Sequence, residues 1–518
     1  MRKWFLNSFF KARIFLLVLS VIFLVVSSLA YENKVFFIHF VDEEDNIVLG
    51  KYLLKGEKLY SDLFSQHQPL AYIFSAGVQK TTQPNSLYLL IKRHREFIIL
   101  YSVVWSLILV ALFRWPLFLF IVIYEPLKFY LFGNLFLSET LVVYPLLYLL
   151  IRIFFSKKSF LNYELILTGF CFGLVIFLLS PIWPLTIFVF LYLLYRIKAQ
   201  ISKNIFLVSL GLLVPTLISL TFSSINEYFY NVFYVNYKYY IPIGSQDSFI
   251  IGFLKSLSAP VISLVLTSET GPVIWITKLL SVILIFNLLI LASMKKYWHT
   301  ILFFVILGLA NSRYITPGKV FYEGFHLLPW VSALLMVVIF STVEVIKDTD
   351  KKFLRIVPAT LIAVTIFFSF YFSLYDSIGL LQKRDMANDQ YINYSRQFDF
   401  GEAIRIMKNE KDRLFVIPDE WLLYWQADIK HASYMVNYYA WMPSVPKIKT
   451  DVDNMFVNNP PEFFYCEPCD EKDLIKYGNY QIVKKEKKNT KLYILKDKAK
   501  QLSIGQVRQL DFYHFSLE

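Results

Sequence analysis

Four consecutive acidic residues near the N-terminus could carry acid–base chemistry. Asp42, Glu43, Glu44 and Asp45 directly precede a segment with the apolar spacing of a helix. Packed like charges raise one another's pKa, which suits a general base that works near neutral pH. The helix macrodipole alone also favours acids at a helix start. The pattern therefore predicts either a general base or a solvated helix start.

A second group of chemically active side chains lies at residues 311–330, where Arg313, Lys319 and His326 precede an apolar run. Cations at a predicted outer membrane boundary run against the usual charge bias, so they suggest an anionic ligand. Arginine can hold a phosphate with two hydrogen bonds, and histidine can donate one more. The alternative is an interfacial arginine and a histidine at a helix start.

Three further ionisable residues lie within or at the end of apolar runs. Glu125 and Lys128 are three residues apart, so they predict a buried functional pair or a pair that only neutralises itself. Glu139 follows Ser138 at the start of another run, where it could be a site residue or a favoured helix N-terminus.

The cysteine spacing and the acidic cluster raise the question of a disulfide or a metal. Cys466 and Cys469 are three apart in a predicted outer segment, where a local disulfide is plausible. A zinc site there would need two more ligands. His67 follows the acidic cluster, so a divalent metal is possible as a cofactor.

Membrane spans must position these residues, because the chain is 56% hydrophobic and only 18% charged. This composition predicts a polytopic α-helical membrane protein and excludes disordered and collagen-like chains. Runs long enough to cross, or nearly cross, a bilayer lie at residues 13–31, 96–113, 116–132, 136–155, 163–180, 183–197, 204–223, 273–293, 298–311, 325–346 and 354–375. The sequence thus predicts about 11 transmembrane helices.

Charge predicts their orientation. The first 375 residues hold 31 Lys and Arg against 18 Asp and Glu, whereas the last 143 hold 21 of each. The net charge of +13 therefore lies beside the spans, as a topology signal and not as a nucleic-acid surface. We expect an integral plasma (inner) membrane protein with a cytoplasmic N-terminus. An odd span count places residues 32–95 and the C-terminus outside. A cleaved signal peptide over the first span is the alternative.

Two domains are predicted, a transmembrane domain over residues 1–375 and a small extracytoplasmic α/β domain over residues 376–518. The second shows two-periodic runs typical of strands at residues 414–417, 462–465, 480–483 and 492–495. The last two runs flank a Lys-rich turn and predict a hairpin.

The first polar loop resembles that of a known family. After the Asp42-Glu43 pair come residues shared with the first extracytoplasmic loop of GT-C glycosyltransferases, namely Gly50, Leu53, Leu54, Gly56, Tyr60, Asp62, Pro69 and Leu70. The resemblance is to protein O-mannosyltransferases and aminoarabinose-type transferases, which use polyprenyl-phosphate sugars. It implies a GT-C-like fold with the acidic pair in the active site. Gln68 departs from the family, which often has a second proline there.

The resemblance implies a glycosyltransferase that moves a sugar from a polyprenyl-phosphate carrier to a lipid, glycan or protein hydroxyl, with inversion. Asp42 or Glu43 would be the base. The candidate substrate-binding residues are Arg313, Lys319, His326, Glu139, Lys128, Tyr60, Asp62 and His67. The alternative is a transporter or flippase for a lipid-linked saccharide. Many transporters contain internal repeats, and this sequence has no detectable one, which argues against that alternative.

Overall fold

The computed structural model describes residues 2–156, 158–244, 249–265, 271–311, 321–470 and 476–517. The chain folds into two compact units. The first comprises Met1–Lys34, Arg95–Ile218 and Asp247–Arg384, and the second comprises Val35–His94, Ser219–Gln246 and Asp385–Glu518. Three separate stretches of sequence thus build each unit.

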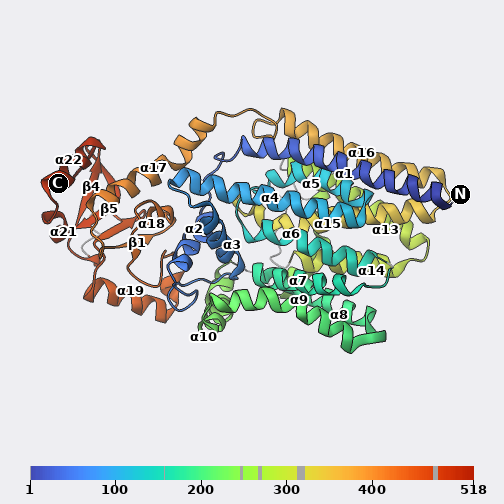
Figure 1. The fold of residues 1–518 in the computed structure, drawn as a ribbon, viewed down its shortest axis with the longest axis horizontal. Helices are drawn as coiled ribbons and strands as arrows, with labels where there is room; N and C mark the ends of the chain where they lie inside the picture. The colour runs from blue at the N-terminus through green and yellow to red at the C-terminus, as the bar shows by residue number, and fades with distance from the viewer. Residues whose placement is uncertain are drawn as a thin grey trace. The chain divides into compact units, whose positions relative to one another are not determined.

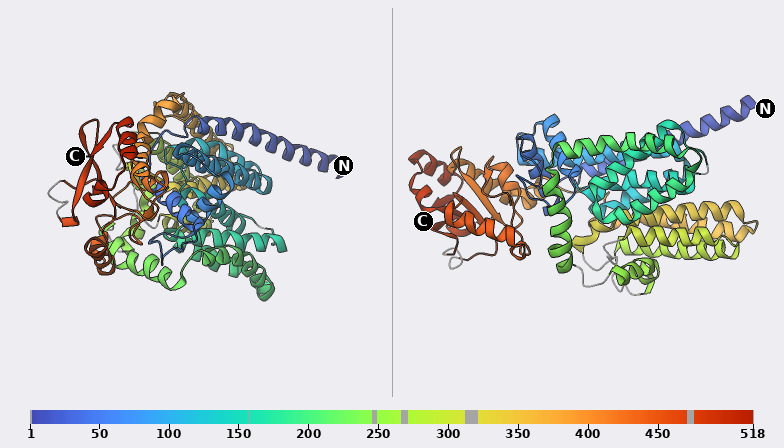
Figure 2. Two further views of the ribbon diagram at one scale, coloured as in Figure 1. Left: turned by 60° about the vertical axis from the view of Figure 1, so that its left-hand side comes forward. Right: turned by 90° about the horizontal axis from the view of Figure 1, so that it is seen from below.

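The described residues of the first unit form helices and the connections between them, and its long helices lie side by side in all three views (Figures 1 and 2). Its elements are α1 (Arg2–Glu32), the greater part of α4 (Leu87–Phe113), α5 (Trp115–Phe129), α6 (Ser138–Leu150) with η1 (Ile151–Phe155), α7 (Asn162–Leu178), η2 (Ser180–Ile182), α8 (Trp183–Arg196), η3 (Lys198–Gln200), α9 (Ile201–Thr221), α12 (Phe249–Val265), α13 (Pro272–Ser293), α14 (Tyr297–Ala310), η5 (Phe321–Leu327), α15 (Leu328–Asp348) and α16 (Lys352–Tyr375).

Seven helices among the described residues are long and apolar enough to cross a membrane. They lie at Arg13–Glu32, Leu87–Phe113, Ser138–Phe155, Lys198–Thr221, Pro272–Ser293, Gly324–Asp348 and Lys352–Tyr375. The prediction of a polytopic helical membrane protein is therefore confirmed. The other four predicted runs also form helices, but these have only 14 to 17 residues. The count of 11 spans stays a prediction.

Polar side chains join some of these helices. Asn287 of α13 is fully buried, and its amide donates hydrogen bonds to the hydroxyls of Ser341 (3.0 Å) and Thr342 (2.8 Å) on α15. Hydrogen bonds of this kind link helices where apolar burial gives little preference for one neighbour over another.

The second unit begins with the first polar loop. It contains α2 (Val41–Leu54) and α3 (Leu70–Thr82), and later α10 (Ile225–Tyr228), η4 (Phe229–Tyr240) and α11 (Ile241–Gly244). Helices α2 and α3 approach closely at Gly50, where an added Cβ would lie 2.4 Å from the Ser75 hydroxyl oxygen. Gly50 of the sequence motif therefore has a packing role.

A six-stranded mixed sheet completes this unit. Its strands are β1 (Arg413–Ile417), β2 (Lys430–His431), β3 (Phe463–Cys466), β4 (Tyr480–Lys485), β5 (Lys488–Leu495) and β6 (Phe515–Leu517), in the order β2-β1-β3-β5-β4-β6. Strand β1 runs parallel to β2 and β3, and the other pairs are antiparallel. The predicted β4–β5 hairpin is confirmed, with a two-residue turn at Glu486 and Lys487 that has positive φ at both positions.

Helices and an apolar core support the sheet. The helical segments are α17 (Met386–Met407), α18 (Leu422–Gln426), η6 (Met442–Ser444), α19 (Pro446–Asn458), α21 (Lys496–Lys500) and α22 (Ile504–Phe512). Phe415, Phe464 and Tyr493 from neighbouring strands pack with Phe456 of α19 in this core. The hydrophobic core of the sheet thus holds β1 and β3 in place. Charged residues follow the C-terminal end of each of these two strands.

Candidate functional site

The acidic cluster lies at the start of α2 in the second unit. Phe40 is extended before the helix, and Asp42, Glu43 and Glu44 occupy the first turn, where the macrodipole favours negative charge. Asp42 is exposed to solvent, whereas Glu43 and Glu44 are each only 1% exposed. Asp42 is therefore the member of the predicted catalytic pair that a solvent-borne substrate can reach.

The remaining acids of the cluster lie among ionisable neighbours. Glu44 pairs with His39, which lies two residues before the helix begins at Val41. Burial raises the pKa of Glu44, and the histidine offsets only part of this increase. Burial lowers the pKa of His39, but the Glu44 carboxylate outweighs burial, so the net shift is upward. The ion pair thus joins the residue two positions before the helix to its first turn.

Asp45 shows most clearly the like-charge effect expected from the sequence. Burial raises its pKa well above the usual value, and the Asp42 charge raises it further. The Tyr72 hydroxyl lies 3.4 Å from Asp45 Oδ2 and 2.7 Å from the Ser65 hydroxyl. The cluster thus combines the exposed Asp42 with Glu44 and Asp45, whose pKa values burial raises.

The other residues of the loop motif have structural contacts. Tyr60 is 1% exposed, has φ 75°, and donates its hydroxyl to the His67 carbonyl at 2.9 Å. Asp62 accepts a hydrogen bond from the Lys58 backbone N–H at 2.8 Å. The His67 backbone N–H donates to the Ser65 hydroxyl oxygen at 3.0 Å. These bonds shape the turn between α2 and α3, and the role of the three residues in binding stays a prediction.

Two residues of the C-terminal segment (Asp385–Glu518) that no sequence pattern indicated also belong to this environment. Arg396 of α17 pairs with Glu420, which follows β1, and its Nη1 lies 3.9 Å from Glu467 beyond β3. Burial raises the pKa of Glu420 to about 7, Arg396 opposes the increase, and Glu44 adds to it. Glu420 lies 376 residues after Glu44, so no local spacing could have linked them.

Two predicted site residues of the first unit meet. His326 Nδ1 lies 2.8 Å from Glu139 Oε1, although 187 residues separate them. Glu139 lies in the first turn of α6, and His326 lies in η5 directly before α15. The carboxylate orients the imidazole ring. The two residues thus form one polar group at the start of two candidate spans.

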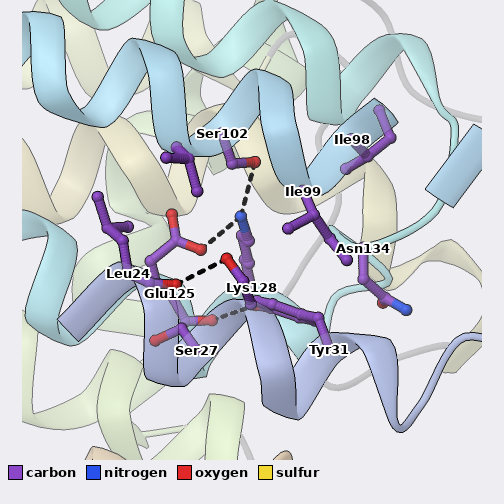
Figure 3. Close-up of a pocket in the computed structure, with 11 residues that line it drawn as sticks. Leu24, Ser27, Tyr31, Ile98, Ile99, Ser102, Glu125, Lys128 and Asn134 are labelled. Atoms are coloured by element: carbon purple, nitrogen blue, oxygen red, sulfur yellow. Dashed lines mark hydrogen bonds and ion pairs between the residues drawn. The ribbon is translucent and has the colours of Figure 1, made fainter. Parts of the chain in front are cut away.

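Glu125 and Lys128 form a buried pair on α5, with Lys128 Nζ 2.6 Å from Glu125 Oε2. Lys128 also donates to the hydroxyls of Ser102 (2.9 Å) and Tyr144 (3.0 Å). A cavity of about 10 Å³ lies beside the pair (Figure 3), which is room for roughly one water molecule. The two charges thus form an ion pair, and the cavity is too small for a sugar. The role of Lys128 in substrate binding stays a prediction.

Arg313 and Lys319 lie outside the described residues. Among the described residues, no group of three or more His, Cys, Asp or Glu side chains is arranged to hold a metal ion.

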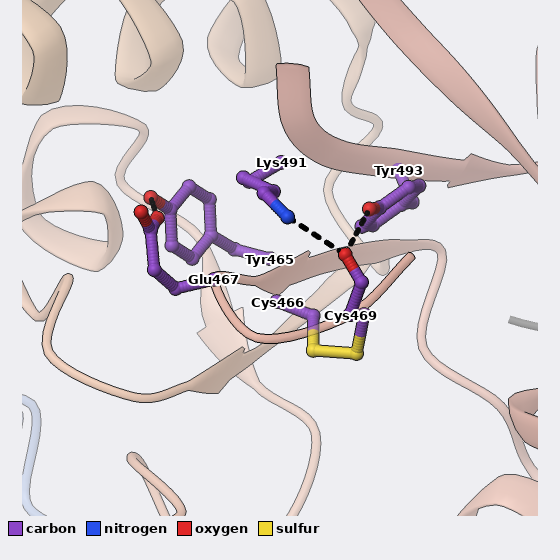
Figure 4. Close-up of a disulfide and its surroundings, with 6 residues drawn as sticks. All are labelled: Tyr465, Cys466, Glu467, Cys469, Lys491 and Tyr493. Atoms are coloured by element: carbon purple, nitrogen blue, oxygen red, sulfur yellow. Dashed lines mark hydrogen bonds between the residues drawn. A yellow bond between two sulfur atoms is a disulfide. The ribbon is translucent and has the colours of Figure 1, made fainter. Parts of the chain in front are cut away.

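Cys466 and Cys469 form a disulfide at the end of β3, with Cα atoms 5.4 Å apart (Figure 4). Lys491 Nζ donates to the Cys469 carbonyl at 2.8 Å, which ties this turn to β5.

The chain matches a solved structure. It is similar to a crystal structure of ArnT from Cupriavidus metallidurans in the apo state, with 11% identity and a TM-score of 0.49, covering 89% of this chain and 95% of that one. ArnT is an aminoarabinose transferase with a GT-C fold, one of the groups that the first loop resembles. No family model and no curated protein matches the sequence.

Proposed function

We propose that this protein is an integral membrane glycosyltransferase that transfers a sugar from a polyprenyl-phosphate donor to an acceptor hydroxyl on the outer side of the membrane. The observation that supports it most directly is the exposed Asp42 at the start of α2, beside the buried Glu43 and Glu44. An exposed carboxylate can reach an acceptor hydroxyl and accept its proton.

In the proposed reaction Asp42 accepts the proton of the acceptor hydroxyl. The acceptor oxygen attacks C1 of the sugar as the bond from C1 to the phosphate oxygen breaks, and the phosphate leaves with the bonding electrons. C1 acquires oxocarbenium character in the transition state. A single displacement of this kind inverts the anomeric centre.

The leaving phosphate needs cationic or hydrogen-bonding partners. On this proposal Arg313 holds it with two hydrogen bonds, aided by Lys319 or by His326, which Glu139 orients. This role for Arg313 rests on its place in the sequence, beside a predicted outer boundary. The proposal assigns no step to the buried Glu125–Lys128 pair, whose charges already partner each other.

The first prediction concerns the base. Asp42→Asn should lower turnover by about a hundredfold or more, because the amide cannot accept the proton, while donor binding stays nearly unchanged. The assay uses purified protein, radiolabelled polyprenyl-phosphate sugars and a crude envelope acceptor.

Asp453→Asn is the matched control, because Asp453 is an exposed acid of α19. It should retain full turnover. Full activity in Asp42→Asn would transfer the role of base to Glu43, which Glu43→Gln tests. If neither variant loses activity, the proposed chemistry is wrong. Movement of a lipid-linked sugar across vesicles without transfer would favour the transporter instead.

A further inference from the structure

Helix α17 of the C-terminal segment binds the backbone that leads into α2. Both belong to the second unit. Asn393 Nδ2 donates to the carbonyls of Phe36 (2.8 Å) and Phe37 (3.1 Å), and the Tyr394 hydroxyl donates to the Ile38 carbonyl (2.9 Å). Three consecutive carbonyls before the acidic turn are thus held by one helix.

The same helix reaches His39, the next residue. Gln397 Nε2 lies 3.3 Å from His39 Nε2, and the Tyr394 ring packs edge-on against the imidazole at 5.5 Å between centroids. His39 in turn pairs with Glu44. The contacts of α17 therefore extend through one side chain into the first turn of α2.

A second part of the C-terminal segment holds the far end of α2. Lys51 Nζ donates to the Tyr424 carbonyl at 3.1 Å and lies 2.8 Å from Asp428 Oδ1. The Tyr52 hydroxyl donates to the Ile429 carbonyl at 2.8 Å. Helix α2 is therefore held at both ends by residues more than 350 positions later in the chain.

We propose that residues 393–397 and 424–429, here called the α2 clamp, position the acidic turn of α2 for sugar transfer. The C-terminal segment is then part of the transfer machinery and not a separate acceptor-binding module. This inference rests on the proposed function. Its physical basis is that a displacement of about 1 Å at a reacting group can cost on the order of a hundredfold in rate.

The geometry gives Tyr394 a positioning role and not a catalytic one. Its side chain is 1% exposed, and its hydroxyl is used by a backbone carbonyl four residues before Asp42. Tyr394→Phe therefore removes one hydrogen bond to the Ile38 carbonyl without removing a charge. The effect should therefore appear in kcat, through the placement of the acidic turn, and not in the KM for either substrate.

The test compares two tyrosines that make the same kind of bond. Tyr394→Phe removes the hydroxyl that donates to Ile38, whereas Tyr480→Phe removes one that donates to the Pro461 carbonyl at 2.7 Å, within the C-terminal segment itself. We expect Tyr394→Phe to lower kcat by about tenfold with KM unchanged. Tyr480→Phe should keep kcat within about twofold of the parent value. Its thermal midpoint should change by about as much as that of Tyr394→Phe.

Hydrogen exchange of residues 40–50 supplies a readout that does not depend on activity. Tyr394→Phe should speed exchange of the α2 amides, and Tyr480→Phe should not. Tyr52→Phe, which removes the bond to Ile429 at the other end of the helix, should act like Tyr394→Phe and serves if that variant fails to fold.

Three outcomes would overturn the inference. Unchanged exchange in both α2-clamp variants would mean that the C-terminal segment does not hold α2. Faster exchange with unchanged kcat would mean that its placement does not matter for transfer. A raised acceptor KM with constant kcat would make the segment a binding module. If neither Asp42→Asn nor Glu43→Gln loses activity, the proposed function fails by itself, while the exchange result still reports on the clamp.

Discussion

Glu420 illustrates at the scale of one residue how burial changes a side chain that looks ordinary in the sequence. It is 1% exposed, and burial raises its pKa from 4.5 to about 7 despite the nearby Arg396. Between these values the folded protein binds more protons at this site than the unfolded chain. Stability should therefore fall as the pH rises from about 4.5 to 7, the reverse of the usual carboxylate behaviour.

Glu420→Gln should remove this dependence, since the amide resembles the protonated acid at every pH. At pH 5 the variant and the parent should have similar thermal midpoints. At pH 8 the thermal midpoint of the variant should exceed that of the parent by about 5 °C. Differential scanning fluorimetry in detergent measures both. Glu410→Gln, at an exposed acid of the same segment, controls for the loss of a carboxylate. The prediction would be contradicted if the thermal midpoints of variant and parent differed by the same amount at pH 5 and pH 8.

At the scale of elements, two glycines set the crossing of α7 and α9. A Cβ added at Gly169 would lie 1.8 Å from the Val208 carbonyl oxygen, and one at Gly211 would lie 1.9 Å from the Ile166 carbonyl oxygen. Small residues let helices within a membrane approach until their backbones touch. No other side chain fits here without separating the helices.

Gly169→Ala should therefore destabilise the protein by about 1 to 3 kcal/mol through overpacking, with no direct effect on the acidic cluster. Fluorescence-detected gel filtration after heating gives the midpoint. Gly77→Ala on α3 is the control, because an added Cβ there meets nothing within 4 Å and alanine favours helix. Equal midpoints for the two variants would show that α7 and α9 can move apart at little cost.

At the scale of the whole molecule, the charge bias predicts that the first polar loop and the C-terminal segment lie on the same, outer side of the membrane. The second unit contains both of these segments, which agrees with this expectation. The side itself, however, is a prediction from the charges beside the spans.

Cysteine labelling tests it in a Cys171→Ala background, since Cys171 is the free cysteine and is buried. An impermeant maleimide should label Asn85→Cys and Lys487→Cys on intact cells, and both positions are exposed. Lys351→Cys, in a predicted cytoplasmic connection, should react only after permeabilisation. If Lys351→Cys reacted on intact cells and the other two positions reacted only after permeabilisation, the acidic turn would lie in the cytoplasm. The proposed reaction on the outer face would then be wrong.

Sequence by itself determined the features that depend on neighbours along the chain. Apolar length predicted the spans, because crossing a bilayer depends on a continuous run of residues. Alternation around a short turn predicted the β4–β5 hairpin, and a separation of three residues brings Cys466 and Cys469 together. Strands β2 and β6 were missed, because two or three residues carry no periodic signal.

Only the tertiary structure decided which charges share an environment. It brought His326 to Glu139, left Asp42 exposed while burying Glu43, and added Glu420 and the α2 clamp to the surroundings of the acidic turn. The partners in these contacts lie up to about 380 positions apart. Burial and pairing at such separations depend on how helices and strands pack, and local spacing holds no record of that packing.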